Sequence, residues 1–309
     1  MKTALVLGVS GGFGKHMAMA LLHQNWHVRV LLRDVQKLPK ELVDRVVVYQ
    51  GDANNLEDVN QAAQGSQVLI YGINVPYEHW QVKAIPLLKV SLEVAKQKQM
   101  TFLFPGNVYV YDPAQGPSFL ESSPKKSVTV KGDIRIKMEG MLEEAANDGL
   151  KILVLRAGDF FGKNVASSWM NFLLKSKPKH YTLTVPGPMN IPHTWAYLPD
   201  LAQQACKLLE QKKWHKNYNE FNFKGHRFSF NELKNIIEKN TGKQVKIKKL
   251  PWWLFKVLAI FKADIREIIA MKYLWFNEIN LESSDPQLTN HSQHNSTKLI
   301  DSLFESELI

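Results

Sequence analysis

The chain opens with glycines whose spacing could bind a nucleotide: Gly8, Gly11 and Gly14, in the sequence GVSGGFG. Residues 2–7 form an apolar run that predicts a buried strand, and the apolar spacing of residues 15–24 predicts a helix. Glycines between a strand and a helix allow a tight turn and let backbone amides approach a pyrophosphate. The helix N-terminus adds N–H groups and a partial positive charge, which favour phosphates. The pattern therefore predicts a dinucleotide site. The predicted cofactor loop also contains Ser10, Gly12 and Phe13.

The end of the second predicted strand, residues 27–32, distinguishes the two nicotinamide cofactors. An acidic residue there accepts hydrogen bonds from the adenosine ribose and favours NAD, whereas an arginine accommodates the 2′-phosphate of NADP. Arg33 comes first and Lys37 follows closely, so the sequence favours NADP. NAD is the alternative, because Asp34 is adjacent to Arg33.

Two further strand ends contribute predicted cofactor contacts. The strand at 45–50 ends at Asp52 and Ala53, where a carboxylate could meet the adenine amino group. The alternative role for Asp52 is to cap the helix that begins near residue 56. The strand at 67–71 is followed by Gly72 and Asn74, where the middle of the cofactor would pass.

Strands and helices alternate along the first half of the chain. Further strands are predicted at 100–104 and 151–155, and long helices at 78–99, with a bend or a new start at Pro86, and at 131–147. This alternation predicts an α/β fold with a Rossmann-type, doubly wound parallel sheet covered on both faces. Beyond residue 160, short strands are predicted at 181–185 and 220–223, and helices at 166–175 and 230–240.

The composition is that of a globular protein from a reducing compartment. Apolar residues make up 45% and charged residues 22% of the 309 residues, as in an ordinary globular protein. The single cysteine, Cys206, excludes an internal disulfide framework and fits a reducing compartment. The sequence contains no stretch of about 20 apolar residues that would predict a membrane span. We therefore expect a cytoplasmic protein without an integral membrane segment.

Positive charge is concentrated in residues 207–256, which contain 13 Lys or Arg and 4 Asp or Glu. Such a surplus could attract nucleic acid, an anionic membrane or a phosphorylated substrate. No nucleic-acid motif accompanies it, so we favour a solvated surface and expect no nucleic-acid partner. The segment PWWLFKVLAIF at 251–261 could form an interfacial helix. We favour a helix that caps the second lobe. His291 and His294 lack further ligands at metal spacing, so we expect no metal site.

Several segments together resemble the extended or atypical branch of the short-chain dehydrogenase/reductase superfamily, which contains nucleotide-sugar epimerases and dehydratases. The similar segments are GVSGGFG (8–14), Gly51-Asp52, GNVYVYDP (106–113), RAGDFFG (156–162), HTWAYLPDLA (193–202) and NELKNIIEKNTGK (231–243). The resemblance implies an NAD(P)-binding domain over 1–160, with returning segments near 190–210, and a mainly substrate-binding lobe over 161–309. It also implies a homodimer that pairs through the helices at 78–99 and 131–147.

The resemblance fails at the proton-transfer group. Active members use a Ser or Thr, a Tyr, and a Lys four residues after the Tyr. Aligned on that pattern, Asn107 takes the Ser or Thr position, Lys131 the Lys position and Ser127 the Tyr position. A second alignment uses Lys137 and places Asp133 at the Tyr position. Neither alignment supplies a tyrosine.

The remaining candidates for catalysis are Asn107, Lys131, Tyr109 and Ser127. A serine hydroxyl is a poor acid or base near neutral pH, whereas an asparagine can donate a hydrogen bond to a carbonyl oxygen. On an extended segment, Tyr109 and Tyr111 would point to the same side. Lys131 resembles the helix lysine of isoflavone-reductase-like proteins, where a lysine serves without the tyrosine, and would bind the ribose or act as an acid.

We therefore expect an NADP(H)-binding oxidoreductase, or an epimerase/dehydratase-like protein, that acts on a carbonyl or sugar-nucleotide small molecule. A non-catalytic NAD(P) sensor is one alternative, because the tyrosine is missing. The other is a peripheral interaction protein that uses its basic C-terminal half.

Overall fold

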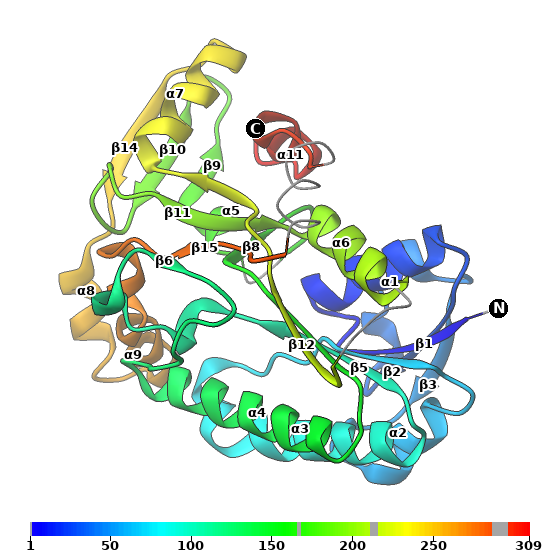
Figure 1. Ribbon diagram of the computed structural model, residues 1–309. Coiled ribbons are helices and arrows are strands. Elements are labelled where there is room, and N and C mark those ends of the chain that lie inside the picture. Colours follow the sequence, from blue (N-terminus) through cyan, green and yellow to red (C-terminus); the bar gives the residue numbers. More distant parts are fainter. Residues whose placement is uncertain (1, 166–167, 211–215, 286–295) are drawn as a thin grey trace.

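The computed structural model describes residues 2–165, 168–210, 216–285 and 296–309, and a seven-stranded sheet forms its centre (Figure 1). Each pair of neighbouring strands in this sheet is parallel. The strands, in spatial order, are β12 (Tyr218–Asn222), β7 (Ile152–Arg156), β5 (Thr101–Gly106), β4 (Val68–Tyr71), β1 (Thr3–Leu7), β2 (His27–Leu32) and β3 (Val47–Gln50). Strand order reverses direction between β1 and β4, which is where ligands bind in open α/β sheets.

Helices cover both faces of this sheet. On one face lie α1 (Gly12–His23) and α6 (Leu198–Glu210), and on the other α2 (Leu56–Ala62), α3 (Trp80–Gln97) and α4 (Val130–Asn147) (Figure 1). Residues of β1 alternate between the two hydrophobic cores: Ala4 and Val6 belong to one, and Leu5 and Leu7 to the other. This alternation follows from the two-residue period of a strand, and it confirms the doubly wound Rossmann-type fold.

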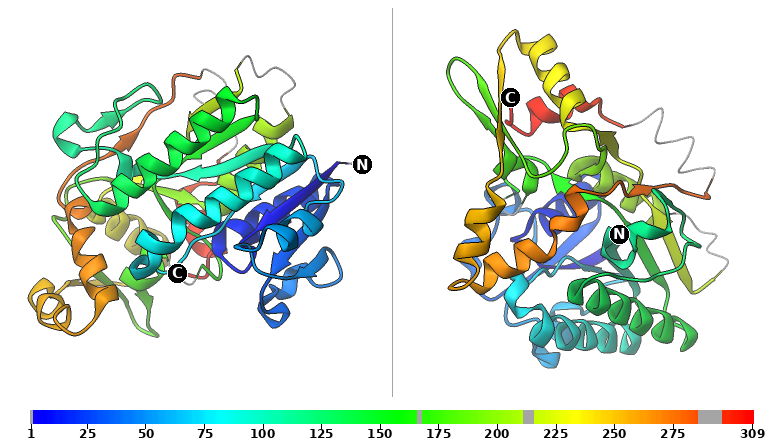
Figure 2. Two further views of the ribbon diagram at one scale, coloured as in Figure 1. Left: turned by 90° about the horizontal axis from the view of Figure 1, so that it is seen from below. Right: turned by 90° about the vertical axis from the view of Figure 1, so that its left-hand side faces the viewer.

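A smaller α/β lobe lies beyond the carboxyl ends of the strands, as the views in Figure 2 also show. Three small sheets belong to this lobe or join it to the main domain. The first consists of β14 (Val245–Lys249), β10 (Tyr181–Val185) and β9 (Leu174–Ser176), and the second of β13 (His226–Phe228), β11 (His193–Tyr197) and β8 (Asp159–Phe161). The third pairs β15 (Asn280–Leu281) with β6 (Ser118–Phe119). The described helices outside the main domain are α5 (Trp169–Leu173), α7 (Phe230–Thr241), α8 (Trp252–Leu258), α9 (Ala263–Ala270) and α11 (Leu299–Glu305).

Some elements differ from the sequence expectations. Pro86 lies inside α3 without dividing it, on the exposed side of the helix. The helix expected at 166–175 is only α5, and the chain then extends into β9, which pairs with β10. Residues 166 and 167 of that prediction lie outside the described residues, as do His291 and His294. Tertiary pairing of Leu174 with Leu183 overrides the helical pattern there.

Within the described ranges, no group of three or more His, Cys, Asp or Glu side chains is arranged to hold a metal ion. None of the described helices combines the length and the apolar character needed to cross a bilayer.

Candidate functional site

The glycine loop joins β1 to α1 and approaches β4 so closely that side chains do not fit. Gly8 has φ +74°, and a Cβ atom added to it would lie 2.3 Å from the Gly72 carbonyl oxygen. A Cβ on Gly14 would lie 2.4 Å from the Gly8 carbonyl oxygen. The glycines therefore place the first turn of α1 directly above the end of β1, with Gly72 beside it.

The N-terminus of α1 fits a phosphate group. Gly11 is the N-cap residue, has no side chain to satisfy the first amides, and is followed by a first turn without acidic residues. These amides remain available for an anion. Ser10 is exposed on the loop, while Phe13 is buried and stacks on Phe160 with ring centroids 5.9 Å apart. Gly12 packs against Val165, where a Cβ would lie 2.8 Å from Cγ1.

At the end of β2, Arg33 is exposed and makes no side-chain hydrogen bond or ion pair within the part of the chain that is described. The neighbouring carboxylate is engaged locally, because Asp34 Oδ1 accepts a 3.0 Å hydrogen bond from the Gln36 amide. Asp34 also lies 4.0 Å from the Lys37 ammonium group.

At the end of β3, Asp52 is exposed and its Oδ1 accepts a 2.9 Å hydrogen bond from the Asn54 amide. Asn55, rather than Asp52, caps α2, since its side chain accepts hydrogen bonds from two amides of the first turn. Ala53 lies half-buried beside it. The capping alternative for Asp52 is therefore wrong, and its contact with adenine stays a prediction.

Asn107 and Ser127, two predicted catalytic residues, are engaged in local hydrogen bonds. Asn107 follows β5, and its side-chain oxygen accepts a 3.1 Å hydrogen bond from the Tyr109 amide. Ser127 precedes α4 and its hydroxyl donates to the Thr129 carbonyl oxygen at 3.1 Å and to the Asp133 carboxylate. The structure therefore does not join Ser127 to Lys131 as a proton-transfer pair.

Lys131, in contrast, lies beside tyrosines. Its side chain is buried on α4, with Nζ 4.7 Å from the centre of the Tyr77 ring. The Tyr77 hydroxyl is 2.9 Å from that of Tyr109, within hydrogen-bonding distance. Lys131 also donates to the Glu267 backbone oxygen at 3.1 Å and pairs with the Glu267 carboxylate on α9. The structure thus gathers Tyr77, Tyr109 and Lys131 in one cluster.

Tyr109 and Tyr111 do not share a side. Residues Val108–Val110 form a 3₁₀ turn (η4) instead of an extended segment, so the two-residue alternation does not apply. Tyr111 stacks on Phe119 with ring centroids 4.3 Å apart, and its hydroxyl donates to a loop carbonyl. Only Tyr109 reaches Tyr77.

Asp159, at the start of β8, is a site residue that the sequence reasoning missed. Its side chain is half-buried and makes no hydrogen bond or ion pair with any residue in the described ranges. Burial raises the pKa of its carboxyl group to about 7. Its charge also contributes to raising the pKa values of Tyr77, Tyr109 and Tyr273, after the larger effect of their own burial. The only local signal was a lone acidic residue in the turn RAGDFFG.

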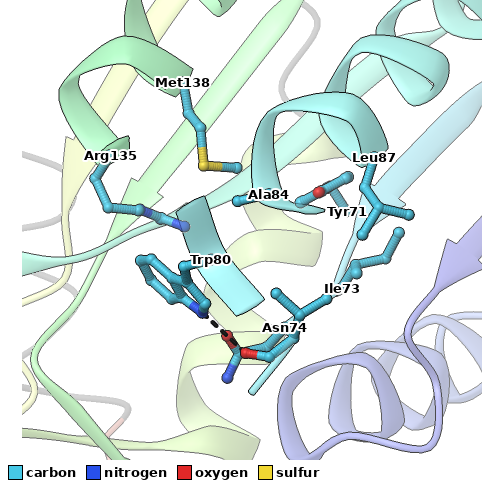
Figure 3. A pocket seen from close by; sticks show the side chains of 9 residues that line it. Tyr71, Ile73, Asn74, Trp80, Ala84, Leu87, Arg135 and Met138 are labelled. Carbon is cyan, nitrogen blue, oxygen red and sulfur yellow. Dashed lines mark hydrogen bonds between the residues drawn. The ribbon is translucent and has the colours of Figure 1, made fainter. Parts of the chain in front are cut away.

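A small open pocket lies between α3, α4 and the end of β4 (Figure 3). Trp80, Ala84 and Leu87 line it from α3, and Arg135 and Met138 from α4. Its remaining lining residues are Tyr71, Ile73, Asn74 and Val75. Asn74 is exposed at the rim of this pocket. Burial lowers the pKa of the Arg135 guanidinium to about 10, and its Nε has no hydrogen-bond partner among the described residues.

A buried ion network supports the end of β5. Arg156 and Glu139 are both fully buried and form two hydrogen bonds of 2.8 and 3.0 Å. Glu220 pairs with Arg156 from the other side, and Lys125 lies 2.8 Å from Glu220 and 3.0 Å from Glu139. Although burial opposes it, the positive charges of Arg156 and Lys125 hold the pKa of Glu139 at about 2. Arg156 also donates a 2.6 Å hydrogen bond to the Asn107 backbone oxygen, and so fixes that strand end.

Comparison with protein families agrees with this architecture. A family described as NAD(P)H-binding matches residues 8–163, and the NmrA-like family matches residues 136–307. The chain belongs to these families, as an atypical short-chain dehydrogenase/reductase. The first match contains the glycine loop, Lys131 and Asp159, and the second contains the smaller lobe. No curated protein sequence matches this NmrA-like chain significantly.

Solved structures share the complete fold. UDP-glucuronic acid 4-epimerase from Bacillus cereus, in complex with NAD, has a TM-score of 0.75 and 17% identity, over 99% of this chain and 97% of that one. UDP-glucose 4-epimerase from Thermus thermophilus, also with NAD, has a TM-score of 0.69 and 16% identity, over 98% and 97%. ADP-L-glycero-D-manno-heptose-6-epimerase from Helicobacter pylori has a TM-score of 0.69 and 16% identity, over 99% and 95%. The chain thus has an NAD(P)-binding, epimerase-like fold.

Proposed function

We propose that this protein is an NADP(H)-dependent reductase or epimerase/dehydratase-like enzyme that acts on a carbonyl-containing or sugar-nucleotide small molecule. The observation that carries the proposal is the gathering of Lys131, Tyr77 and Tyr109, with Asp159 within electrostatic range. This group lies on the segments that follow β4, β5 and β7, at the carboxyl ends of parallel strands, where ligands bind in such sheets.

Each residue has a distinct role in the proposed reaction. The nicotinamide ring, when bound, supplies or accepts the hydride. Lys131 binds the adjacent ribose, and the hydroxyl of Tyr109 donates a hydrogen bond to the substrate oxygen. Asp159 transfers the proton, because a carboxyl group with a pKa of about 7 can both donate and accept a proton near neutral pH. The raised pKa of Tyr109 makes the phenolate costly to form, so Tyr109 orients the substrate.

The preference for NADP rests on the end of β2. Arg33 has a free guanidinium group within the described structure, which suits a 2′-phosphate. The Asp34 carboxylate, which would favour NAD, already accepts from a backbone amide. Titration calorimetry of the whole protein with NADP and NAD tests this directly. We expect Arg33→Ala to weaken NADP binding about tenfold and to leave NAD binding unchanged; equal affinities of the unaltered protein for both would contradict the preference.

Catalysis is tested with Asp159→Asn, assayed for NADPH oxidation across panels of carbonyl compounds and nucleotide sugars. We expect activity to fall by about 10²–10⁴-fold while cofactor affinity is retained. The limb of the pH profile near about 7 should disappear with the carboxyl group. Asp44→Asn is the matched control at an exposed position outside the site and should retain activity. Full activity of Asp159→Asn would exclude its role in proton transfer.

A non-catalytic NAD(P) sensor is the second candidate, and the Lys131–Glu267 pair favours it, since α9 holds the lysine that the cofactor ribose would use. The variant Lys131→Ala distinguishes an enzyme from a non-catalytic sensor. Turnover that is lost in this variant while cofactor binding persists would exclude the sensor. Cofactor binding without turnover of any compound by the unaltered protein would favour it.

The paired helices α3 and α4 support a homodimer as the assembly. They pack against each other on one face of the sheet, and Val82 on α3 is 73% exposed. Sedimentation equilibrium of the protein and of Val82→Asp tests this surface. A monomeric unaltered protein would contradict the dimer.

A further inference from the structure

The segment from Trp252 to Lys262 exposes a large apolar surface. Six large apolar side chains within nine residues are exposed, and none of the residues of α8 is buried. Their exposed fractions are Trp253 70%, Leu254 38%, Val257 49%, Leu258 37%, Ile260 70% and Phe261 82%. Contiguous apolar surface of this kind marks an interaction site. We call these six residues the α8 patch.

The α8 patch is one-sided. At 100° per residue, the four patch residues within α8 (Trp253, Leu254, Val257 and Leu258) fall within an arc of about 140°, and Ile260 and Phe261 lie in the turn that follows the helix. Trp252 and Phe255 lie outside this arc and face the protein, where the Trp252 indole donates a 2.6 Å hydrogen bond to the Pro186 carbonyl oxygen. The hairpin of α8 and α9 lies at the periphery of the molecule in all three ribbon views (Figures 1 and 2). The patch therefore lies on the outer side of α8 and of the turn after it, while the inner side of α8 is anchored to the protein.

Positive charge surrounds the α8 patch. Lys256 borders the patch on the helical wheel of α8, Lys262 directly follows Phe261 in the chain, and both lysines are exposed. Residues 246–272 contain seven Lys or Arg and only two Asp or Glu. One of these acids, Glu267, is paired with Lys131 and does not offset the lysines. Within the described ranges, Lys248, Lys249, Lys256 and Lys262 form no ion pair.

We infer that the α8 patch and its border lysines dock the protein onto an anionic membrane surface. Tryptophan, phenylalanine and aliphatic side chains on one face, with lysines at the borders, are the composition of a helix lying in a bilayer interface. The lysine stems can extend along the apolar face and place their ammonium groups among lipid phosphates. A second copy of the chain fits less well, because a twofold interface would bring like charges together.

Co-sedimentation of the full-length protein with vesicles tests this inference without a substrate. The vesicles contain phosphatidylcholine alone or phosphatidylcholine with phosphatidylserine, at low and at high salt. We expect binding to the anionic vesicles only, and weaker binding at high salt. Trp253→Ser with Phe261→Ser should reduce the partition coefficient at least tenfold. Each of Lys256→Gln and Lys262→Gln should reduce it about fivefold.

Substitutions of the same residue types at exposed positions outside the α8 patch serve as controls. Phe304, 47% exposed on α11, supplies Phe304→Ser, and exposed Lys298 supplies Lys298→Gln; both should bind like the unaltered protein. Absence of vesicle binding, or equal binding by the Trp253/Phe261 variant, would overturn the inference. So would a dimer in sedimentation equilibrium that this variant disrupts, since a second copy would then cover the patch. Cofactor titration of the same variants keeps this result separate from the proposed enzymatic function.

Discussion

Arg156 and Asp159 are three residues apart in the chain, yet their side chains enter opposite electrostatic surroundings. Arg156 is enclosed by Glu139 and Glu220, with Lys125 completing a network of two positive and two negative charges. Asp159 lies on β8 without an ion pair among the described residues, near groups that are neutral at neutral pH. The first region balances its buried charges, and the second leaves one carboxyl group uncompensated.

This difference assigns the two regions different roles: the Arg156 network stabilises the backbone, and Asp159 takes part in the proposed chemistry. A buried charge with partners on every side resists titration, as the pKa of about 2 for Glu139 shows, and can only hold backbone in place. The half-buried Asp159 has no partner among the described residues, and desolvation raises its pKa to about 7, so its carboxyl group can exchange a proton near neutral pH. Arg156 positions Asn107 through its backbone oxygen, and Asp159 offers the proton. Substitutions in the two regions should therefore have opposite effects on stability.

The largest effect is expected from Arg156→Met, which leaves the buried carboxylates of Glu139 and Glu220 with Lys125 as their one remaining cationic partner among the described residues. We expect the free energy of unfolding to fall by about 3–5 kcal/mol, measured by urea denaturation near neutral pH. Arg227→Met is the control, because Arg227 pairs with Glu278 while its side chain is 50% exposed. It should cost at most about 1 kcal/mol. Similar losses in both variants would contradict the structural role of the network.

Asp159→Asn should act in the opposite direction, and only above a certain pH. The pKa of Asp159 is raised from 3.8 to about 7 in the folded protein, so folding favours the protonated form. The unaltered protein therefore loses stability as pH rises through about 4 to about 7, and the asparagine variant does not. Unfolding at about pH 8 should show the variant more stable by about 2–4 kcal/mol, with equal stabilities near about pH 4. A less stable variant at the higher pH would mean that Asp159 is paired.

The smallest effect concerns Lys131, which is buried but has a single carboxylate partner. Glu267→Gln removes that negative charge from α9, and we expect NADP affinity to rise by about two- to fivefold because Lys131 becomes free for the cofactor. Titration calorimetry measures the change. Glu282→Gln, which removes the exposed partner of Lys224, should leave the affinity unchanged. Weaker NADP binding after Glu267→Gln would show that the pair holds Lys131 in its binding position.

The sequence predicted what depends on neighbouring residues. The strand, the glycine loop at Gly8–Gly14 and the helix form where their spacing indicates, because the turn itself depends on glycines that are close in sequence. The parallel sheet followed equally from the alternation of strands and helices. The roles of the predicted cofactor and catalytic residues stay predictions.

The rest of the site arises from contacts between distant segments. Tyr77 and Tyr109 are 32 positions apart, and Lys131 and Glu267 are 136 apart, so no local spacing connects them. The 3₁₀ turn after Asn107 rotates Tyr109 away from Tyr111, which alternation along a strand cannot anticipate. Trp253 was expected in a helix capping the second lobe, and Trp252 does pack inward, but Trp253 is 70% exposed. Which of two adjacent tryptophans faces outward depends on the helix orientation, which tertiary packing decides.

The most direct test of the uncompensated carboxyl group is an NMR titration of protein labelled with ¹³C at the aspartate carboxyl carbons, with Asp159→Asn to assign the resonance. We expect the resonance that is missing in the variant to titrate near pH 7 in the unaltered protein. A midpoint at or below about 4, the ordinary value of an aspartate, would show that Asp159 is solvated or paired. Asp159 would then not be the proton-transfer group.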